Sequence, residues 1–441
     1  MADTAPRLRR ALTLRDLIFY GIVCIQPTAP MPPFGAVAVE ARGHVVTTIL
    51  IALVAMLFTA VSYGRMSRVY PSAGSSYSYI AGEFGATAGF VTGWSILLDY
   101  LLNPLICVIW SSSAAANLLP QVPSFAWKVF FALLFTLLNL RGIEASARTT
   151  RWLAIGMSTV VAYMLAMMAR YIYIKGNLEL LRPFYDPETF SWAAVSTGTS
   201  IAALTYIGFD TISTLSEEAV NPKRDILRAT VLVCFLIGVI SAIEVYFGQL
   251  VYPDYNHFPD VDTAYVFVAG RAGGPFLFHL VNVTLLVATV GSGMSAQLGG
   301  ARLMYGMGSQ GALPKFFTHI DTRTAIPGRN VIVCGALVLV FAVGRVGKLE
   351  MDYQLGAEML NFGAFLAFIG VNLAAFWHYW VKKNDRSWSQ AVLPLLGAAV
   401  CLYIWASLRW QAKAVGGVWV LLGLTYLLVQ RARQNRTPTL S

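Results

Sequence analysis

Residues 17–39 read LIFYGIVCIQPTAPMPPFGAVAV, an uncharged stretch with four prolines, Pro27, Pro30, Pro32 and Pro33, in its middle. It exceeds the roughly 20 residues that a helix needs to cross the hydrocarbon core of a membrane. Each proline lacks a backbone N–H donor and clashes with the preceding helical turn. We therefore predict a spanning helix that unwinds at the prolines, although the prolines alone are equally compatible with a simple kink. In lipid, such a break is tolerated only where it is buried in protein or lines a cavity.

A second, milder interruption is expected at Gly208-Phe209-Asp210, where a glycine precedes the only carboxylate of another apolar segment. The two interrupted segments occupy the first and sixth positions among the predicted spans, which are corresponding places in two five-helix halves. Paired interruptions of this kind mark a substrate site near the membrane midplane in transporters built from inverted repeats. The pairing weakens the alternative that the prolines are a mere kink.

The whole chain has the composition of a membrane protein. Its 441 residues are 57% hydrophobic and 12% charged, whereas an ordinary soluble domain is roughly 25% charged. Further uncharged windows cover 45–64, 189–209, 272–301 and 387–408, and weaker candidates lie near 86–116, 125–141, 150–170, 226–250, 328–345, 356–380 and 414–430. We predict an all-α membrane protein with twelve transmembrane helices.

The net charge of +10 is explained by its distribution along the chain. If the amino terminus is cytoplasmic, most of the Lys and Arg residues fall in cytoplasmic ends and loops, which is the bias that orients membrane proteins. We therefore predict a multi-pass protein of the cell (inner) membrane with both termini in the cytoplasm. The basic balance then requires no nucleic-acid partner.

The reactive residue types show no catalytic or metal-binding pattern. The cysteines are Cys24, Cys107, Cys234, Cys334 and Cys401, all inside predicted spans, and the histidines are His44, His257, His279, His319 and His378. Neither set has the spacing of a metal site, and the chain lacks HExxH, Gly-x-Ser-x-Gly and a Gly-rich phosphate loop. We expect no enzyme, no cofactor and no metal. A channel is disfavoured as well, since no filter-like segment is present.

Several motifs resemble those of the amino acid, polyamine and organocation (APC) superfamily. They are Tyr63-Gly64-Arg65 followed by YPSAGSSYSY at 70–79, Gly93-Trp94 with Leu98-Asp99-Tyr100, Gly208-Phe209-Asp210 through Ser216-Glu217-Glu218, and Asn361-Phe362-Gly363. Together with the pattern of spans, the resemblance covers essentially the whole chain. Within the superfamily, LLDYL at 97–101 and the segment 208–218 look most like bacterial putrescine importers.

The resemblance implies a leucine-transporter-type fold, with a five-plus-five inverted repeat in which helices 1 and 6 are unwound. It implies alternating access, with substrate held between helices 1 and 6 by residues from helices 3, 8 and 10. The expected division is a first repeat at 1–175 (helices 1–5), a second repeat at 176–385 (helices 6–10), and trailing helices 11 and 12 with a cytoplasmic tail at 386–441.

The chain departs from the superfamily at the helix 1 break. Many amino acid permeases have a Gly-rich break whose N–H groups clamp the substrate carboxylate. In the stretch from Gln26 to Pro33, four of eight residues cannot donate, so this anion site is degraded and a substrate without a carboxylate fits better. The alternative is that the N–H groups of Thr28, Ala29 and Met31 suffice, which would make the protein an amino acid permease or exchanger.

Asp210 is the main candidate for pairing with a cationic amine, because an ionisable residue inside a membrane is a functional hypothesis by default. It could also cap the second half of helix 6, and the two roles can coexist. We interpret Asp99, in the middle of helix 3, as structural or conformational. Tyr100, Tyr206 and Phe209 could form cation–π contacts and a thin gate, or could simply pack.

The remaining candidates concern lining, coupling and gating. Ser292, Ser295 and Gln297 on helix 8 could line the site, bind Na⁺, or bond to the backbone one turn earlier, which is the commoner outcome. Glu358 and Glu244 are candidates for a proton site or a vestibule acid, and we expect Glu244 to reach the interface. Several proton-coupled relatives carry a helix 5 Lys at the position of Met157, so its absence here leaves Asp210 or Glu358 as protonatable sites.

The candidate substrate site is therefore Gln26, Pro27, Thr28, Ala29, Pro30, Asp99, Tyr100, Tyr206, Ile207, Phe209, Asp210, Ser292, Ser295 and Asn361, and the candidates for coupling or gating are Asp210, Glu358, Glu217 and Glu218. The expected function is secondary active import of a small organic amine, such as putrescine, another polyamine or ethanolamine. The sequence leaves open uniport, proton symport or exchange, a sodium site, and the oligomeric state.

Overall fold

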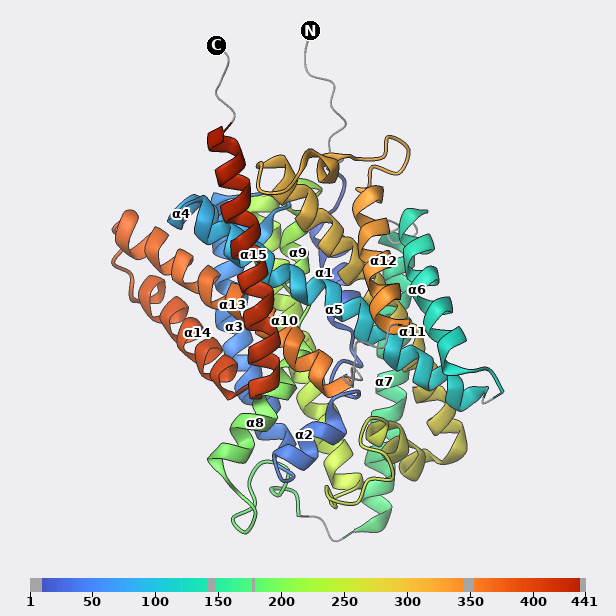
Figure 1. Ribbon diagram of the computed structural model, residues 1–441. Coiled ribbons are helices and arrows are strands. Elements are labelled where there is room, and N and C mark those ends of the chain that lie inside the picture. The colour runs from blue at the N-terminus through green and yellow to red at the C-terminus, as the bar shows by residue number, and fades with distance from the viewer. Residues whose placement is uncertain (1–9, 120, 142–146, 177–178, 344–352, 437–441) are drawn as a thin grey trace.

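The computed structural model describes residues 10–119, 121–141, 147–176, 179–343 and 353–436. Within these ranges every regular element is a helix (Figure 1). The extreme ends of the chain lie outside the described residues, so the expected position of the termini is followed only to residues 10 and 436. The start of α1 and the end of α15 lie at the same end of the molecule, and α2 and α8 lie toward the opposite end (Figure 1).

The helices follow one another with short connections. Their bounds are α1 Leu14–Ile25, α2 Phe34–Glu40, α3 Val45–Val69, α4 Ser75–Phe84, α5 Ala86–Leu118, α6 Ser124–Leu140, α7 Ala147–Lys175, α8 Trp192–Ala202, η2 Ala203–Tyr206, α9 Thr211–Thr214, η3 Leu215–Glu217, α10 Pro222–Val251, α11 Ala264–Ser309, η4 Lys315–Thr318, α12 Gly328–Val343, α13 Tyr353–Phe376, η5 Trp377–Lys382, α14 Trp388–Ser407 and α15 Trp410–Arg436.

Eight of the described helices, α3, α5, α7, α10, α11, α13, α14 and α15, are long and apolar enough to cross a membrane. The helices α6 and α12 are shorter and also apolar. Large apolar side chains such as Leu137, Val340 and Leu421 are exposed on their outer faces. In lipid, a helix satisfies its backbone hydrogen bonds internally and can present such side chains to acyl chains. The chain is therefore a multi-pass membrane protein.

The first apolar segment consists of two helices. α1 ends at Ile25, and its C-cap residue Gln26 has a positive φ of 69°. The prolines follow, and α2 begins at Phe34, directly after Pro33. Residues without an N–H donor cannot continue the helical hydrogen-bond ladder, so the chain crosses 26–33 in a series of turns.

The segment from 192 to 217 is also divided. α8 passes into the 3₁₀ turn η2, and the short helix α9 begins only at Thr211. Gly208 between them has a φ of +118°, which L side chains rarely adopt. The interruption therefore falls on the one residue of this stretch that adopts such a backbone conformation at no steric cost.

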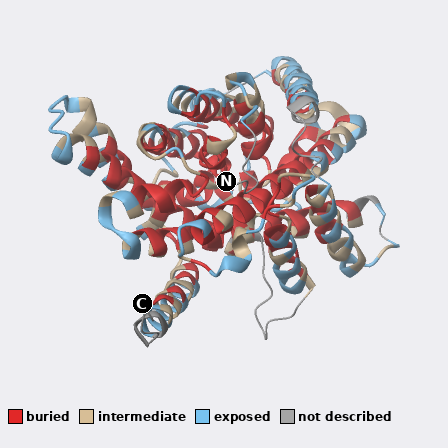
Figure 2. Ribbon diagram, turned by 90° about the horizontal axis from the view of Figure 1, so that it is seen from above, coloured by how far each residue is buried: buried red, intermediate tan, exposed pale blue. Residues whose placement is uncertain are grey.

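The core forms where α5 and α11 cross the centre of the molecule. The most extensive helix pairings are α3 with α10, α5 with α11, and α5 with α13. Figure 2 shows buried residues concentrated in this centre, whereas the carboxyl-terminal helix carries many exposed ones. α11 bends at Gly274, where φ is 72°, just before Pro275. Its first part, 264–273, therefore runs in a different direction from the part that crosses the core.

Candidate binding site

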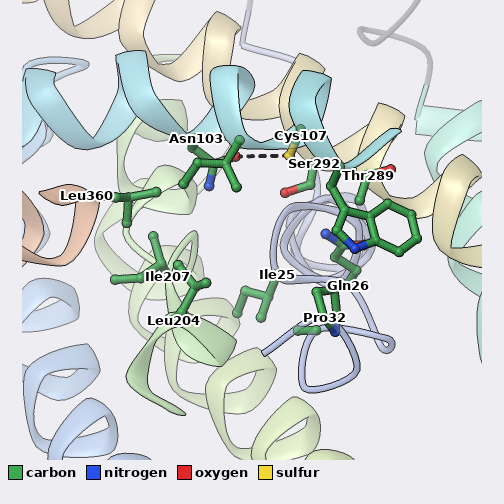
Figure 3. A pocket seen from close by; sticks show the side chains of 13 residues that line it. Ile25, Gln26, Pro32, Asn103, Cys107, Leu204, Ile207, Thr289, Ser292 and Leu360 are labelled. Carbon is green, nitrogen blue, oxygen red and sulfur yellow. Dashed lines mark hydrogen bonds between the residues drawn. The ribbon is translucent and has the colours of Figure 1, made fainter. Parts of the chain in front are cut away.

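A cavity lies beside the two interrupted segments. It is lined by Ile25, Gln26, Ala29 and Pro32 from the first interruption, Asn103, Ile106, Cys107 and Trp110 from α5, Leu204 and Ile207 from the second interruption, Thr289 and Ser292 from α11, and Leu360 from α13 (Figure 3). About 520 Å³ of space that no protein atom fills lies within it, part of it open to the outside. Its walls are mostly apolar with a few polar groups, which is typical of small-molecule sites.

The polar groups in and beside the cavity are held by three hydrogen bonds, one of which joins distant helices. The hydroxyl of Ser292 donates to the carbonyl of Cys24 at 3.0 Å, which satisfies a carbonyl in the last turn of α1. Thr28 donates to the side-chain oxygen of Gln26 at 3.3 Å. On α5, the thiol of Cys107 donates to the amide oxygen of Asn103 at 3.5 Å (Figure 3). The bond from Ser292 thus joins α11 to the end of α1, directly before the first interruption.

The N–H donors of the first interruption are largely consumed within it. The N–H of Ala29 donates to the carbonyl of Gln26 at 3.2 Å, and the N–H of Met31 donates to the carbonyl of Thr28 at 3.1 Å. These are two of the three groups that could have clamped a carboxylate. A carboxylate at this break would therefore have to compete with existing backbone hydrogen bonds.

Two buried carboxyl groups interact with each other behind the cavity. Asp99 on α5 and Asp210 before α9 are 1% and 0% exposed. The Tyr100 hydroxyl donates to Oδ2 of Asp210 at 2.8 Å. The Oδ1 atoms of both aspartates have no hydrogen-bond partner, and no ion pair among the described residues reaches either one. Because neighbouring buried carboxylates repel each other and are poorly solvated, the pair favours a bound proton or a cation.

Of the predicted substrate-site residues, Gln26, Ala29, Ile207 and Ser292 line the cavity, and the others do not. Tyr206 donates to the carbonyl of Ile49 on α3 at 2.8 Å. The ring of Phe209 packs against Tyr63 and Phe368, with centroid distances of 5.6 and 5.2 Å. These two aromatic side chains hold helices together in this conformation.

Asn361 and Ser295 are likewise engaged away from the cavity. The side-chain amide of Asn361 on α13 donates to the carbonyl of Ser200 at the end of α8 at 2.9 Å. Ser295 is buried at 1% exposure. Thr28, Pro27 and Pro30 lie in the first interruption but outside the cavity lining. Some of the predicted residues therefore line the cavity, and others contact neighbouring helices around it.

Sequence reasoning missed four polar or aromatic lining residues, Thr289 on α11 and Asn103, Cys107 and Trp110 on α5. The three on α5, together with Ile106, follow Asp99 at the spacing of one helix face. Since Asp99 was already a candidate, extending its face by about three turns toward the end of α5 would have identified them.

The opposite side of the interrupted segments is closed by charged contacts. Arg302 on α11 forms an ion pair with Glu218, with 3.0 Å between Nε and Oε1, and lies 3.4 Å from the Tyr20 hydroxyl. Oε1 of Glu217 accepts the backbone N–H of Ala73 at 2.9 Å. The expected gating residues Glu217 and Glu218 thus connect the second interruption to the segment before α4 and to α11.

The loop helix α4 is fastened to the end of α13 on the same side. Glu83, whose side chain is fully buried, accepts from the Tyr70 hydroxyl at 2.8 Å and contacts Nδ1 of His378 at 2.5 Å. Burial and the hydrogen bond to Glu83 raise the pKa of Tyr70 to about 12. Tyr70 therefore stays a neutral donor in this contact at physiological pH.

Glu358 and Glu244 differ from each other in their surroundings. Oε2 of Glu358 lies 2.7 Å from Nε of Arg409 in the connection between α14 and α15. Glu244 is 0% exposed, and neither of its carboxyl oxygens has a partner. The expectation that Glu244 reaches the membrane interface was wrong, because its face of α10 packs against other helices instead of lipid.

The described residues contain neither a cluster of metal-binding side chains nor a disulfide bond. Among them, no three His, Cys, Asp or Glu side chains gather closely enough to hold a metal ion. All five cysteines are free and buried, and only Cys107 lines the cavity.

Comparison with known proteins identifies similar chains across the full length. A family model described as amino acid permease matches residues 28–429. The low-affinity putrescine importer PlaP of Escherichia coli is 33% identical over 447 residues, covering 98% of this chain and 96% of that protein. The branched-chain amino acid permease BcaP of Lactococcus lactis is 25% identical over 466 residues, covering 98% and 97%.

A solved structure shares the fold. It is that of Mhp1, a nucleobase-cation-symport-1 family transporter in a closed conformation with bromovinylhydantoin bound. The TM-score is 0.54 at 14% identity, and the match covers 93% of this chain and 96% of that one. This likeness concerns the fold alone.

Proposed function

Because the chain belongs to the amino acid permease family of membrane transporters, we propose that it imports a small organic amine by alternating access. The observation that carries the proposal is the pair Asp99 and Asp210, two buried carboxyl groups behind the cavity without a cationic side chain between or beside them in the described residues. Such a pair lowers the free energy of a bound cation. The 33% identity to a putrescine importer supports the same substrate class.

The proposal includes the arrangement of the chain in the membrane. We count α1 with α2 as the first span and α8 with η2 and α9 as the sixth, which together with the eight long and two shorter apolar helices makes twelve. Residues 1–175 and 176–385 would form the inverted repeats, and 386–441 the trailing helices and tail. Both termini would lie in the cytoplasm of a bacterium, as supported by the shared end of α1 and α15 (Figure 1).

Recognition of the amine would combine a polar end and an apolar wall. The ammonium group approaches the first interruption near Gln26 and is drawn to the unpartnered Oδ1 of Asp210. The methylene groups contact Ile106 and Leu360, and the indole of Trp110 offers a face for cation–π contact. The substrate would replace the Tyr100 hydroxyl as the main partner of Asp210.

Inward movement of a cation is favoured by the membrane potential, by about 2.3 kcal/mol per charge for each 100 mV. Rocking of the interrupted segments against α5 and α11 would break the Arg302–Glu218 pair and open the site to the cytoplasm. For proton coupling within the site, Asp210 is the better candidate than Glu358, because Glu358 already has a cationic partner in Arg409.

An amino acid permease or exchanger is the second candidate function. It is favoured by the description of the matching family and by the branched-chain amino acid permease among the relatives. It requires a carboxylate clamp at the first interruption. The bonds from Ala29 and Met31 within the break oppose it, because they leave Thr28 alone among the three proposed donors.

A panel of matched ligands separates the two functions. We expect putrescine to raise the apparent melting temperature of the purified protein more than ornithine, which is putrescine with an added carboxylate. A ligand at 100 times its Kd stabilises a folded protein by about 2.7 kcal/mol, a shift that is readily measured. The same comparison can be made for a branched chain with leucine, with 3-methylbutylamine, which lacks the carboxylate, and with 4-methylpentanoate, which lacks the amine. Stabilisation by intact amino acids only would replace our proposal with the permease.

Cys107 provides a built-in reporter of the cavity. We expect a small membrane-impermeant methanethiosulfonate reagent to modify a single thiol, Cys107, since the other four cysteines are buried outside the cavity lining. A bound amine should slow this modification at least about tenfold, because the two occupy the same space. Mass spectrometry of the labelled chain is the measurement, and Cys107→Ser is the control. Modification unaffected by any amine would place the amine elsewhere.

A further inference from the structure

An acidic residue of α10 is buried without a hydrogen-bond or ion-pair partner among the described residues. Glu244 is 0% exposed, and both of its carboxyl oxygens lack a hydrogen-bond partner. Ser241, one turn earlier on the same helix, is also 0% exposed, and its hydroxyl oxygen likewise lacks a partner. Residues three apart in a helix share a face, so the two side chains form one small polar patch inside the protein.

The patch lies where α10 meets three other segments. The hydroxyl of Tyr265, in the first part of α11, donates to the backbone carbonyl of Glu244 at 2.9 Å and lies 3.9 Å from the sulfur of Met168 on α7. The ring of Phe34, the first residue of α2, packs edge-on against Tyr265 at 5.0 Å. Tyr265 therefore joins the backbone of α10 at Glu244 to α2 and to α7.

Several charged or titratable groups of the elements around α10 are engaged elsewhere. Tyr265 is a titratable side chain near Glu244, and its hydroxyl donates to the backbone. Directly before α3, His44 contacts the Ala41 carbonyl and the Asp186 N–H. On α1, Asp16 pairs with Arg151 of α7. No ion pair in the described part of the chain involves Glu244.

A carboxylate without a counter-ion or a donor is very costly in such surroundings, so the group takes up a proton instead. The contacts of Tyr265 beside it reach α2, directly after the first interruption, and α7. Separation of α2 from α10 and α11 would admit water to Glu244 and allow the proton to leave. The protonation of Glu244 is thereby linked to the conformation of the transporter.

We propose that Glu244 is a proton-binding site of the transport cycle, which carries one proton inward with each amine. Its carboxylate takes a proton from external water, forming an O–H bond that persists while α2, α7 and α11 enclose it. In the inward-open state, cytoplasmic water reaches Glu244, the O–H bond breaks, the proton passes to that water and the carboxylate remains. This inference rests on the proposed amine import and adds the coupling ion and its binding residue, outside the substrate cavity.

The bound proton can be observed without any transport. We expect the infrared spectrum of the purified protein to contain the carbonyl stretch of a protonated carboxylic acid that disappears in Glu244→Gln and shifts in deuterated water. Asp254→Asn, which removes an exposed carboxylate paired with His257, is the matched control and should leave that band in place. If Glu244→Gln removes only the signal of an ionised carboxylate, the proposal is overturned. Glu244→Met gives the same comparison should the amide destabilise the fold.

Coupling is then measured in liposomes that contain a trapped pH indicator. For one proton per amine, an imposed pH difference of one unit should raise amine accumulation by up to about tenfold. We expect Glu244→Gln to keep downhill uptake and to lose this increase together with the amine-dependent proton influx. An unchanged increase in the variant, or amine uptake without protons in the natural chain, would overturn the inference and leave amine import standing. Absence of amine uptake by the natural chain would instead overturn the proposed function, and the infrared result would be unaffected.

Discussion

Asp210→Asn is expected to fold and insert like the natural protein and to lose amine uptake by roughly 100-fold or more. Removal of one partner from a buried charge interaction typically costs 2–5 kcal/mol, and about 2.8 kcal/mol corresponds to 100-fold. Asn has nearly the shape of Asp, and its amide oxygen can still accept the Tyr100 hydroxyl that lies 2.8 Å from Oδ2. The loss should therefore appear in transport and not in stability.

Uptake of radiolabelled putrescine into proteoliposomes, with a thermal melt of the same preparation, is the measurement. Asp254→Asn in an exposed loop makes the same chemical change outside the site and should transport normally. Tyr100→Phe removes the hydrogen bond but keeps the charge, so we expect a smaller loss than for Asp210→Asn. Normal uptake by Asp210→Asn would show that the pair Asp99 and Asp210 does not bind the substrate.

Gly208→Ala is expected to lower both stability and transport. Gly208 has a φ of +118°, and an added Cβ would lie 3.3 Å from the carbonyl carbon and oxygen of Cys24, at the end of α1. A residue held in such a sparsely populated conformation costs about 1–3 kcal/mol. Because the contact joins the two interrupted segments, the strain acts directly on the site, and we expect at least about a tenfold loss of uptake.

Gly156→Ala is the control for this substitution. Gly156 lies on an exposed face of α7, and nothing lies within 4 Å of its added Cβ. Ala is the better helix former there by about 1 kcal/mol, so this variant should melt at the same or a higher temperature. If Gly208→Ala behaves like Gly156→Ala in melting and uptake, the interruption tolerates side chains and its geometry is less constrained than we infer.

The amino-acid sequence predicted the class of protein because hydropathy is a local property. Long apolar stretches without charge exclude a soluble fold whatever their neighbours are, and motifs such as Asn361-Phe362-Gly363 placed the chain in its family. The positions at which α1 ends and α9 begins also follow from covalent chemistry. Proline lacks a donor at 27, 30, 32 and 33, and Gly208 alone in its stretch adopts a positive φ freely.

The sequence was a weaker guide to the partners of each side chain. Asp210 was a candidate for pairing with an amine, and the sequence did not indicate that its carboxylate accepts the Tyr100 hydroxyl. Glu358 was a candidate for a proton site or a vestibule acid, and the sequence did not indicate its pairing with Arg409, which lies 51 positions later in the chain. Contacts of this kind depend on how helices far apart in the sequence are rotated against one another. A helical period identifies a face but not which neighbour covers it.

Glu244 illustrates the same limit most clearly. From its surrounding residues it reads as an acid near the end of an apolar helix, where a carboxylate usually reaches the lipid headgroups. Its backbone carbonyl accepts the Tyr265 hydroxyl, and Tyr265 in turn contacts Phe34 and Met168, so the packing near Glu244 involves three other segments. The sequence by itself determined that this protein crosses the membrane and where two of its apolar segments break, because composition and the chemistry of proline and glycine act locally. Only the tertiary structure decided which acids face substrate, which pair with arginine and which is left without a partner, because burial is a property of packed helices.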